Sequence, residues 1–442
     1  MNLKSSDLKK VLIVTYYWPP AGGPGVQRWL KFVKYLRDFG IEPIIYTHSN
    51  GEIPSVDESL LKDVPEGITI LKQPIWEPYG FYKKLLGKKS NEKINTGFLT
   101  EQKKPKRIES FSVFVRGNFF IPDARKFWIK PSTNYLTDYL KNNPVDAVIS
   151  TGPPHSMHLI AMGLKKNFPA LPWIADFRDP WTNIDFYKDL KLTTWADKKH
   201  KRLEREVLQT ANTVITIGKT LGNELVELGA KKCVVIHNGF DESDLPKEGH
   251  QPPLDSKFTI AHIGSMNKAR NPNVLWQALS ELVKENSEFS KELSIKLVGK
   301  VDYHVQQQLK AFQLDTYLHK IDYIPHSEVI VEQQKSHVLL LVVNDAPNAK
   351  GILTGKIFEY LAAQRPIIAI APKDGDLAEV LQKTETGVVF EDHTTQVAAL
   401  KSHILELFQN RHLPYVASQN FMQFSRRNLT KDLAEVVKGV VG

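Results

Sequence analysis

The sequence predicts an α/β protein made of two Rossmann-like, doubly wound parallel-sheet domains. Short runs rich in β-branched residues alternate with segments that repeat apolar residues every three to four positions, which is typical of strand–helix alternation. Many of these runs are apolar throughout, as in strands covered on both faces. A chain of 442 residues also exceeds what one ordinary core accommodates. Together these observations favour two domains with parallel sheets.

The first half of the chain predicts seven strands, over 11–17, 43–48, 68–73, 145–151, 172–177, 213–218 and 233–239. A helix is expected after the first strand, because Val26, Leu30, Val33 and Leu36 recur with helical spacing and Gly40 follows as a stop. The second half predicts six more strands, over 258–264, 293–299, 321–324, 338–343, 366–371 and 387–390. The last stretch, from about 415 to 437, has a helical pattern.

A segment rich in Pro, Asp and Glu separates the two series and has no apolar period, which favours a linker. We therefore expect an N-terminal domain over 1–240, a linker over 241–257 and a C-terminal domain over 258–413. The remaining residues, 414–442, are expected to form a helix that crosses back to the first domain.

Residues 75–130 interrupt the alternation with aromatic and basic residues, so we expect an insertion there. The chain has a net charge of +9, and part of the excess lies in this segment, at Lys83, Lys84, Lys88, Lys89, Lys103, Lys104, Lys106 and Arg107. Such clusters attract polyanions, although a solvated loop is an equal alternative. Because Phe111, Phe114, Phe119, Phe120, Phe127 and Trp128 lie among these charges, we hypothesise that the insertion forms the acceptor side and touches an anionic membrane surface.

Bulk composition limits the class of protein. A hydrophobic content of 42% with 24% charged residues is that of a soluble globular protein. No run approaches the roughly 18 apolar residues that a membrane span requires. The single cysteine, Cys233, excludes an internal disulfide and is compatible with a reducing cytosol. With no secretory signal in view, we expect a cytoplasmic protein that could be peripheral on the inner face of the membrane.

Two loops have the features of a phosphate-binding site, since ligands of parallel α/β sheets bind beyond the carboxyl ends of strands, at helix N-termini. In 16-YYWPPAGGPGVQR-28, Gly22 and Gly23 would let a ligand approach the backbone, although a plain tight turn is an equal reading. In 350-KGILTGKIFEYL-361, Thr354 is a cap candidate, Lys356 falls in the first helical turn and Glu359 lies on the same face. A cation at a helix N-terminus is unfavourable alone, which favours a bound polyanion.

Six motifs in order give the chain a family resemblance: 18-WPPAGGPGVQR-28, 151-TGPPHS-156, 175-ADFRDPW-181, 236-IHNGFD-241, 262-HIGSMNKARNP-272 and 355-GKIFEYLAAQRPIIAI-370. The chain resembles GT-B-fold, retaining glycosyltransferases of the group often called family 4, or glycosyltransferase group 1. The resemblance covers essentially the whole length. It implies two lobes facing across a cleft and a nucleotide-sugar donor.

The resemblance also implies site residues. Three would be catalytic: His155 at the sugar, and Arg270 and Lys356 at the diphosphate. The donor would further meet Gly22, Gly23, Tyr323, Ile324, Thr354, Glu359, Gly375 and Asp376, with Glu359 on the ribose and the backbone around Tyr323 and Ile324 on the base. Relatives often carry a second Glu eight residues before the ribose Glu, but this chain has Gly351 there. The sugar contact is then missing or comes from Lys350 or Asn348.

The resemblance implies a metal-independent reaction without cofactor, in which the acceptor attacks from the leaving-group side. The 374-DGD-376 motif matches a metal-binding pattern but favours a turn and an N-cap. Arg28 is expected to be solvated, with a phosphate role as the minor alternative, and Arg178 is a candidate partner of Asp179. The acceptor would be a glycan or a lipid-linked molecule, in bacterial surface polysaccharide or glycoconjugate synthesis.

Two other classes of function stay open. A sugar-nucleotide epimerase or hydrolase on the same fold would need acid/base carboxylates at the site. A non-catalytic protein would bind an anionic membrane or nucleic acid, and the usual modules for specific nucleic-acid binding are not found in the sequence.

Overall fold

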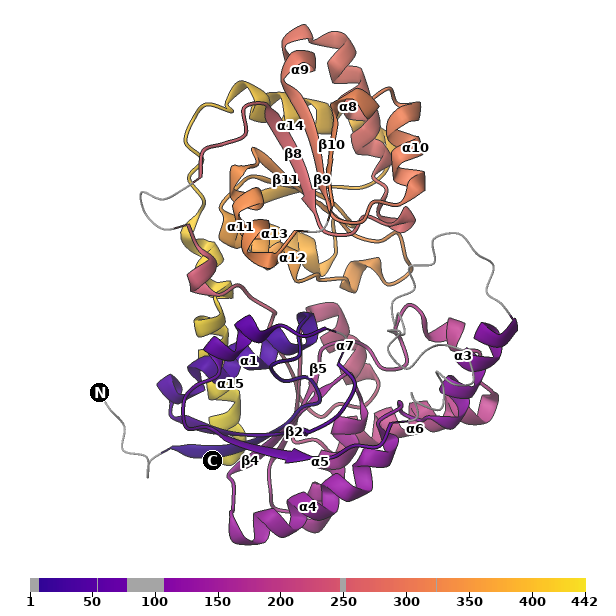
Figure 1. Ribbon diagram of the computed structural model, residues 1–442, viewed down its shortest axis with the longest axis vertical. Helices are drawn as coiled ribbons and strands as arrows, with labels where there is room; N and C mark the ends of the chain where they lie inside the picture. The colour runs from indigo at the N-terminus through magenta and orange to yellow at the C-terminus, as the bar shows by residue number, and fades with distance from the viewer. Residues whose placement is uncertain (1–7, 54, 78–106, 247–251, 323) are drawn as a thin grey trace. The chain divides into compact units, whose positions relative to one another are not determined.

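The computed structural model describes residues 8–53, 55–77, 107–246, 252–322 and 324–442 (Figure 1). The chain forms two compact units, each with its own parallel sheet. The first unit contains residues Met1–Asn238 and Arg426–Gly442, and the second contains Gly239–Ser425. The chain thus passes from one unit to the other within the 236-IHNGFD-241 motif.

The first unit is built on seven strands, which confirm the seven predicted runs. They are β1 (Lys9–Val14), β2 (Ile41–His48), β3 (Thr69–Gln73), β4 (Ala147–Gly152), β5 (Trp173–Phe177), β6 (Thr213–Thr216) and β7 (Cys233–Val235). Their spatial order is β3-β2-β1-β4-β5-β6-β7, and every pair is parallel. In this doubly wound order the chain reverses its direction of travel between β1 and β4.

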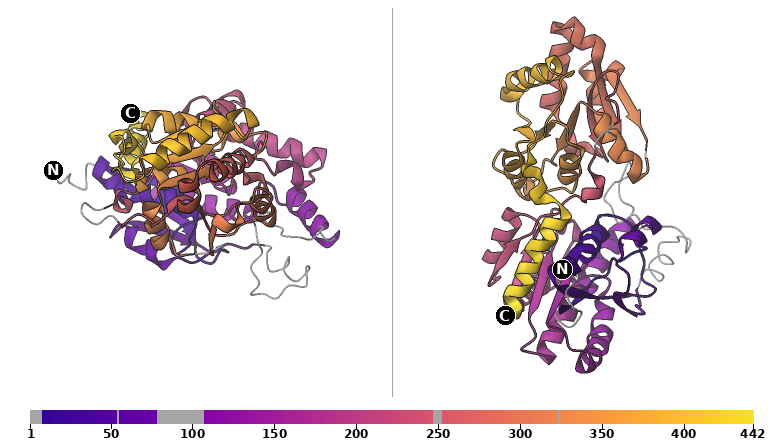
Figure 2. Two further views of the ribbon diagram at one scale, coloured as in Figure 1. Left: turned by 90° about the horizontal axis from the view of Figure 1, so that it is seen from above. Right: turned by 90° about the vertical axis from the view of Figure 1, so that its left-hand side faces the viewer.

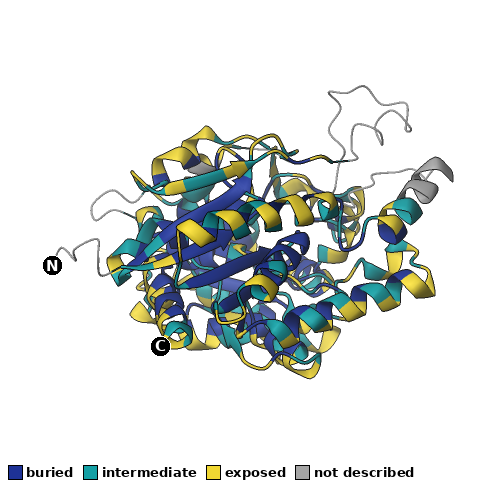
Figure 3. Ribbon diagram, turned by 90° about the horizontal axis from the view of Figure 1, so that it is seen from below, coloured by how far each residue is buried: buried dark blue, intermediate teal, exposed yellow. Residues whose placement is uncertain are grey.

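Helices cover both faces of this sheet. Figure 3 shows that the strands are buried and that the exposed residues lie on the outer sides of the helices. The helices on the sheet are α1 (Pro24–Leu36), α4 (Ile129–Asn142), α5 (Ser156–Asn167), α6 (Thr194–Thr210), α7 (Lys219–Glu227) and α15 (Arg426–Val441), while α3 (Arg107–Phe119) packs on α6. One core cluster joins α1 and α15 to the sheet, and the other joins α4, α5 and α6 to the opposite face. Helix α1 starts at Pro24, and the left-handed Gly40 follows the short 3-10 turn at its end.

The C-terminal helix is shorter at its start than the sequence predicted. Residues Gln419–Phe424 form a 3-10 turn that stays with the second unit, and only α15 belongs to the first. Figure 2 shows α15, in yellow, alongside the strands of the first unit. Its buried residues Leu429, Leu433 and Val437 recur every four positions, and Arg427 pairs with Asp38 at 2.6 Å. A single apolar face therefore docks this helix against α1.

The second unit repeats the architecture with six parallel strands. They are β8 (Phe258–Ile263), β9 (Leu293–Val298), β10 (Leu318–Ile321), β11 (Val338–Val342), β12 (Ile367–Ile370) and β13 (Gly387–Phe390), in the order β10-β9-β8-β11-β12-β13. The predicted strand over 321–324 lies too late in the chain. The observed β10 is an edge strand with half-exposed residues, so it lacks the apolar run that marks the other strands.

Among the described residues, the helices of the second unit are α8 (Asn273–Glu285), α9 (Ser287–Glu292), α10 (Tyr303–Ala311), α11 (His326–Lys335), α12 (Lys356–Ala363), α13 (Asp376–Thr384) and α14 (Val397–Gln409). One core cluster takes side chains from α8, α9, α10 and α14, and another takes them from α12 and α13. The two clusters occupy opposite faces of the sheet, because alternate residues of β8 and β11 belong to different clusters.

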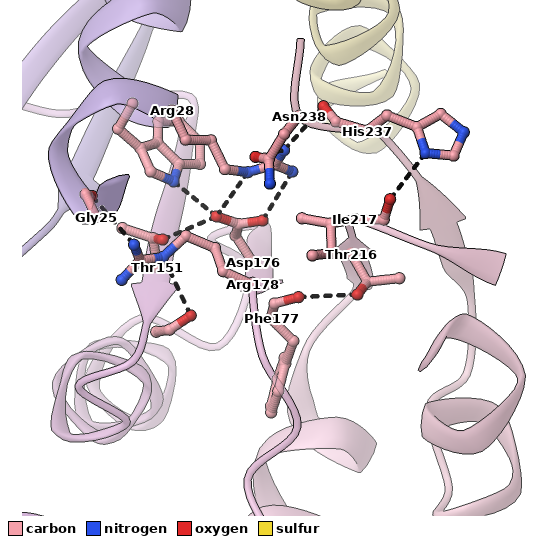
Figure 4. Close-up of polar contacts among 12 residues, drawn as sticks. Gly25, Arg28, Thr151, Asp176, Phe177, Arg178, Thr216, Ile217, His237 and Asn238 are labelled. Carbon is pink, nitrogen blue, oxygen red and sulfur yellow. Dashed lines mark hydrogen bonds and ion pairs between the residues drawn. The ribbon is translucent and has the colours of Figure 1, made fainter. Parts of the chain in front are cut away.

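A buried ion pair ties together three parts of the first unit (Figure 4). Arg28 on α1 is 1% exposed and Asp176 on β5 is fully buried. The Arg28 guanidinium donates to both Asp176 oxygens, at 3.1 and 3.4 Å, and to the carbonyl oxygen of His237 at 3.0 Å. Trp29 Nε1 and Thr151 Oγ1 donate to the same carboxylate at 2.7 and 2.8 Å. The expectation of a solvated Arg28 was wrong, because its partner lies far away in the sequence.

A second arginine holds the loops at the ends of β4 and β5. Arg178 donates to the carbonyl oxygens of Gly25 (3.1 Å), Gly152 (3.3 Å) and Pro153. These contacts join the start of α1 to the 151-TGPPHS-156 loop. The guanidinium thus bonds main-chain carbonyls, whereas the sequence pointed to a pair with Asp179.

We expect Arg28→Met to destabilise the first unit by about 3–5 kcal/mol, because it leaves a buried carboxylate without its counter-charge. Urea unfolding followed by tryptophan fluorescence reports on this unit, since Trp276 is the only tryptophan between residues 239 and 425. The control is Lys141→Met, which breaks the exposed Lys141–Asp138 pair and should cost under about 1 kcal/mol. Equal losses in the two variants would contradict the assigned role.

Candidate functional site

The loops that follow β8 and β11 bring two cations to the carboxyl edge of the second sheet. Strand β8 ends at Ile263 and leads through Gly264 to a 3-10 turn, Lys268–Arg270. Strand β11 ends at Val342 and leads to α12, which starts at Lys356. Because β8 and β11 are neighbours at the reversal of strand order, Arg270 and Lys356 meet where such sheets bind ligands.

Lys356 folds back over the backbone of Gly264. A Cβ atom on Gly264 would lie 2.5 Å from Lys356 Nζ, and Gly264 has a φ of +132°, so only glycine fits there. The ammonium group makes no hydrogen bond or ion pair with any residue that the structure describes. Burial lowers the pKa of Lys356, the charge of Arg270 lowers it further, and Glu359 raises it. The fold therefore holds a cation at a place that disfavours it.

Arg270 is held by neutral acceptors. Its Nε donates to Asn344 Oδ1 at 2.6 Å and one terminal nitrogen donates to the carbonyl oxygen of Ser265 at 3.3 Å. Burial lowers the pKa of Arg270. No ion pair with a described carboxylate offsets its charge, so Arg270 and Lys356 form an uncompensated cation pair.

Helix α12 is fixed against the sheet by Tyr360, whose hydroxyl accepts from the Ile263 amide (3.1 Å) and donates to the Leu340 carbonyl (3.3 Å). Glu359 lies on the same helix, one turn after Lys356, and accepts from Gln333 Nε2 at 3.3 Å. The α12 start thus has a carboxylate beside its cation. A nucleotide offers the complementary groups, because its phosphates can pair with the cation and its ribose hydroxyls can donate to the carboxylate.

Polar atoms without partners surround the α12 start. Thr354 Oγ1 and Asn348 Oδ1 are buried and have no hydrogen-bond partner among the described residues. The prediction of Thr354 as the N-cap was wrong, because Gly355 occupies that position without a side-chain bond. Lys350, the other suggested replacement for the missing Glu, pairs with Asp374 at 2.5 Å. Asn348 is therefore the neighbour of Gly351 whose side chain is available to a ligand.

The 374-DGD-376 motif lies at the start of α13, where Gly375 is the N-cap and Asp376 is the first helical residue. Gly375 packs on the preceding 3-10 turn, since a Cβ atom there would lie 3.0 Å from the Lys350 carbonyl oxygen. Asp376 is 6% exposed, whereas Asp374 is exposed. The expected cap is thus the glycine, not an aspartate. Ile324 packs against the same core cluster as α12, and Tyr323 lies outside the described residues.

A cavity of about 840 Å³ adjoins Arg270 at the same edge of the sheet. Polar side chains of the turn after β8, of α10 and of the loop after β11 line it, including Asn271, His304, Gln308 and Asn344. Asn344 also binds Arg270, so the cavity and the cation pair share one wall. Lys356 and Glu359 are not among the residues that line this cavity.

In the first unit, His155 lies directly after β4, as the N-cap of α5. It is 8% exposed and its ring stacks on Trp181, with centroids 4.5 Å apart and an angle of 4°. Burial lowers the pKa of His155 well below its ordinary value, and His158 and Arg178 lower it further. Its Nδ1 has no partner among the described residues. His155 is therefore a neutral hydrogen-bonding group near neutral pH.

A second histidine backs His155 and was missed by the sequence reasoning. His158 Nδ1 hydrogen-bonds Ser150 Oγ at 2.9 Å, and its ring stacks on Phe177 at 4.5 Å. A Cβ atom on Gly152 would lie 2.6 Å from His158 Nε2 and 3.0 Å from His155 Nδ1, so both rings pack on this glycine. The i, i+3 spacing in the first turn of α5 was the available signal.

The two glycines of the opening loop differ. Gly22 is buried, and a Cβ atom there would lie 2.8 Å from Ser55 Oγ, while its amide donates to the Ser55 carbonyl at 2.9 Å. Gly23 has a φ of +97° and open space around it. Packing of the segment around Ser55 thus requires the first glycine, and only Gly23 presents accessible backbone.

The described residues lack two features, a cluster of metal ligands and a membrane-spanning helix. They contain no group of three or more His, Cys, Asp or Glu side chains placed to hold a metal ion. None of the helices in this part of the chain is long and apolar enough to span a bilayer.

The strand orders and the two units define the class of structure, which is the two-domain α/β GT-B fold. The Anabaena protein HepE, solved in complex with UDP-glucose, covers 98% of this chain and 100% of its own, with a TM-score of 0.57 and 14% identity. A Listeria monocytogenes protein assigned as a UDP-N-acetylglucosamine 2-epimerase covers 98% and 96%, with a TM-score of 0.53 and 10% identity. At such identities the likeness establishes the fold alone.

Within this class, the second unit carries the family signal. Residues 257–410 match the family model described as glycosyl transferases group 1. An uncharacterized glycosyltransferase of Methanocaldococcus jannaschii is 24% identical over 220 residues, which are 49% of this chain and 55% of that protein. The chain thus spans about half the length of the curated relative that it matches.

We expect Lys356→Met to raise the free energy of unfolding by about 1 kcal/mol, because it removes an unpaired, partly buried cation. Burial lowers the pKa of Lys356, so the native state binds fewer protons than the unfolded state. Its unfavourable contribution is therefore largest at neutral pH and fades as the pH rises toward 10.5. Urea unfolding at pH 7 and pH 10 measures both effects. A variant less stable than the parent at pH 7 would contradict the account.

We also expect stability to fall as the pH drops from 6.5 to about 4. Burial lowers the pKa of His158 to about 3, and of His48, His262 and His337 to about 4. Below 6.5 the unfolded state takes up protons that the native state excludes, at about 1.4 kcal/mol per pKa unit. Urea unfolding at pH 7.5, 6 and 5 tests this. A free energy of unfolding that stays constant over this range would refute it.

Proposed function

We propose that the protein is a glycosyltransferase that moves a sugar from a nucleotide-sugar donor to a glycan or lipid-linked acceptor. The cation pair Arg270–Lys356 carries this proposal, because it stands at a helix N-terminus without an acidic partner among the described residues and with Glu359 one turn away. The group 1 match over 257–410 supports it, as does the UDP-glucose bound to HepE, a protein of the same fold.

In the proposed donor complex, the diphosphate lies between Arg270, Lys356 and the free amides at the start of α12. Fixed cations and helix amides stabilise the charge that develops on a departing nucleoside diphosphate, without reorganisation in the transition state. Glu359 accepts hydrogen bonds from the ribose hydroxyls. The base lies near Ile324 and Tyr323.

The transferred sugar meets the unpartnered oxygens of Thr354 and Asn348 and the backbone amides around Gly375 and Asp376. From the family resemblance we further propose that His155 of the first unit acts on the sugar as a neutral imidazole and that Gly23 offers bare backbone to the donor. Asn348 takes the place of the carboxylate that relatives carry eight residues before the ribose Glu. An amide both donates and accepts, so it recognises a sugar hydroxyl without adding a negative charge beside the phosphates.

We propose that the reaction retains the anomeric configuration, as in family 4. The bond from the anomeric carbon to the phosphate oxygen breaks, and the acceptor oxygen bonds that carbon from the same side. The acceptor proton passes to a donor phosphate oxygen, so the nucleoside diphosphate leaves with it. This scheme needs neither a metal nor a pair of carboxylates. We place the enzyme, as a hexosyltransferase, in the cytoplasm, in bacterial surface polysaccharide or glycoconjugate synthesis.

Two measurements test the proposed function. Isothermal titration with UDP, GDP, ADP and CMP-linked donors identifies the base. Incubation of the bound donor with and without glycan and lipid-linked acceptors follows its fate by chromatography, and proton NMR of the product gives the anomeric configuration. Sugar transfer that requires an acceptor supports the proposal. Conversion of the donor sugar without acceptor would instead indicate an epimerase or hydrolase.

We expect Glu359→Ala and His155→Ala to affect different steps. Loss of a charge-assisted hydrogen bond to the ribose should weaken donor binding by roughly 10- to 100-fold. His155→Ala should lower turnover while nucleotide affinity stays the same, because the imidazole contacts only the sugar. Titration with the free nucleoside diphosphate and initial rates with the sugar donor separate the two. The assignment of both residues fails if the variants keep the parental affinity and rate.

A further inference from the structure

One surface of the first unit exposes large aromatic side chains that are usually buried. Trp76 is 63% exposed, Phe119 and Trp195 are each 62% exposed, and Phe127 is 43% exposed. Trp76 and Phe127 pack edge to face, with centroids 4.9 Å apart, and Phe120 lies 6.1 Å from Phe127. Clustered aromatic exposure of this kind marks an interaction surface and is not scattered surface hydrophobicity.

Two lysine side chains pack on these aromatic rings. Lys126 Nζ is 4.9 Å from the Phe127 centroid, and Lys199 Nζ is 4.8 Å from the Trp195 centroid. Lys126 also donates to the carbonyl oxygen of Phe119. Burial lowers the pKa of Lys126, and the charge of Lys199 lowers it further because the two ammonium groups repel each other. We call Trp76, Phe119, Phe127, Trp195, Lys126 and Lys199 the aromatic–lysine surface.

Helix α6 extends this surface with a basic face. It packs beside α3 (Figure 1), and it buries Ala196, His200, Glu204, Val207 and Leu208. Its exposed side carries Trp195, Lys198, Lys201, Arg202 and Arg205. Lys201 pairs with Asp197 and Arg202 with Glu206, whereas Lys198 and Arg205 form no ion pair with a described residue. The exposed face of α6 is therefore positive and carries an aromatic ring at its start.

We propose that the aromatic–lysine surface, with the basic face of α6, docks the protein on an anionic lipid bilayer. Tryptophan and phenylalanine rings enter the headgroup–acyl boundary, and lysine stems lie along it with their charges at the lipid phosphates. The net charge of +9 has the sign that anionic lipids attract. A second copy is a poorer occupant, because a symmetric contact would set Lys126 and Lys199 against their equivalents. This inference does not depend on the proposed transferase activity.

Vesicle flotation tests the inference without any donor or acceptor. The parent should float with vesicles that contain 30% phosphatidylserine in phosphatidylcholine and should stay behind with pure phosphatidylcholine. Lys126→Gln with Lys199→Gln should lower the partition coefficient on the order of fivefold per lysine. Phe127→Ala with Trp195→Ala should lower it on the order of tenfold, through lost apolar burial.

Matched controls remove an exposed ring and an exposed cation elsewhere. Tyr303→Ala, at a residue that is 59% exposed in the second unit, and Lys141→Gln, on α4, should both float like the parent. Circular dichroism confirms that each variant is folded. Equal recovery on neutral vesicles, no flotation, or equal losses in the controls overturn the proposal. The proposal is also overturned if the surface variants float like the parent and instead lose binding to DNA or self-association.

Discussion

Parallel strand pairing is the constraint from which the rest of the structure follows. Each strand of a parallel sheet ends at the same edge, so the loops that follow β4, β5, β8 and β11 all collect there within their own unit. A buried strand cannot carry polar groups along its length without partners, and polar side chains therefore concentrate at its end. His155, Asp176 and Arg270 lie at or soon after such ends, and Lys356 starts the helix that follows β11. The parallel pairing of the strands thus determines where the polar and charged side chains of each unit gather.

The two units treat buried charge in opposite ways. In the first, Asp176 receives hydrogen bonds from Arg28, Trp29 and Thr151, so the charge is balanced and both carboxylate oxygens accept hydrogen bonds. In the second, Lys356 and Arg270 stand side by side against neutral oxygens. A balanced buried pair fixes architecture, whereas an unbalanced pair stores binding energy for an anion. This contrast is the reason that we propose a binding role for Arg270 and Lys356 and a structural role for Arg28.

The repeated strand–helix pattern made most of the fold predictable. The features that could not be predicted depend on contacts between residues far apart in the sequence. The strands were found because each is a short apolar run between helical patterns, and β10 was misplaced because its residues are half-exposed. The burial of Arg28 could not be read from its helix, since Asp176 lies 148 positions away. Thr354 followed the general preference for N-caps, but Gly355 took that position.

The candidate site followed from the resemblance more than from local pattern, and the structure shows why. Arg270 and Lys356 come from different loops, and nothing in either segment states that the other is near. His158 escaped notice because a histidine in a helix is more often a packed core residue. The sequence cannot show that the oxygens of Thr354 and Asn348 lack hydrogen-bond partners, because this depends on the folded structure.

In the proposed donor complex, the balance of charges accounts for Gly351 at the position where relatives often carry a Glu. Lys356 and Arg270 supply two positive charges and Glu359 one negative charge, so the described groups sum to one positive charge. A nucleoside diphosphate ester brings about two negative charges, which leaves the proposed complex with a net charge of about −1. Another carboxylate beside the phosphates would add repulsion that the two partly buried cations must also offset. An amide at Asn348 avoids that cost and keeps the hydrogen-bonding capacity that a sugar hydroxyl requires.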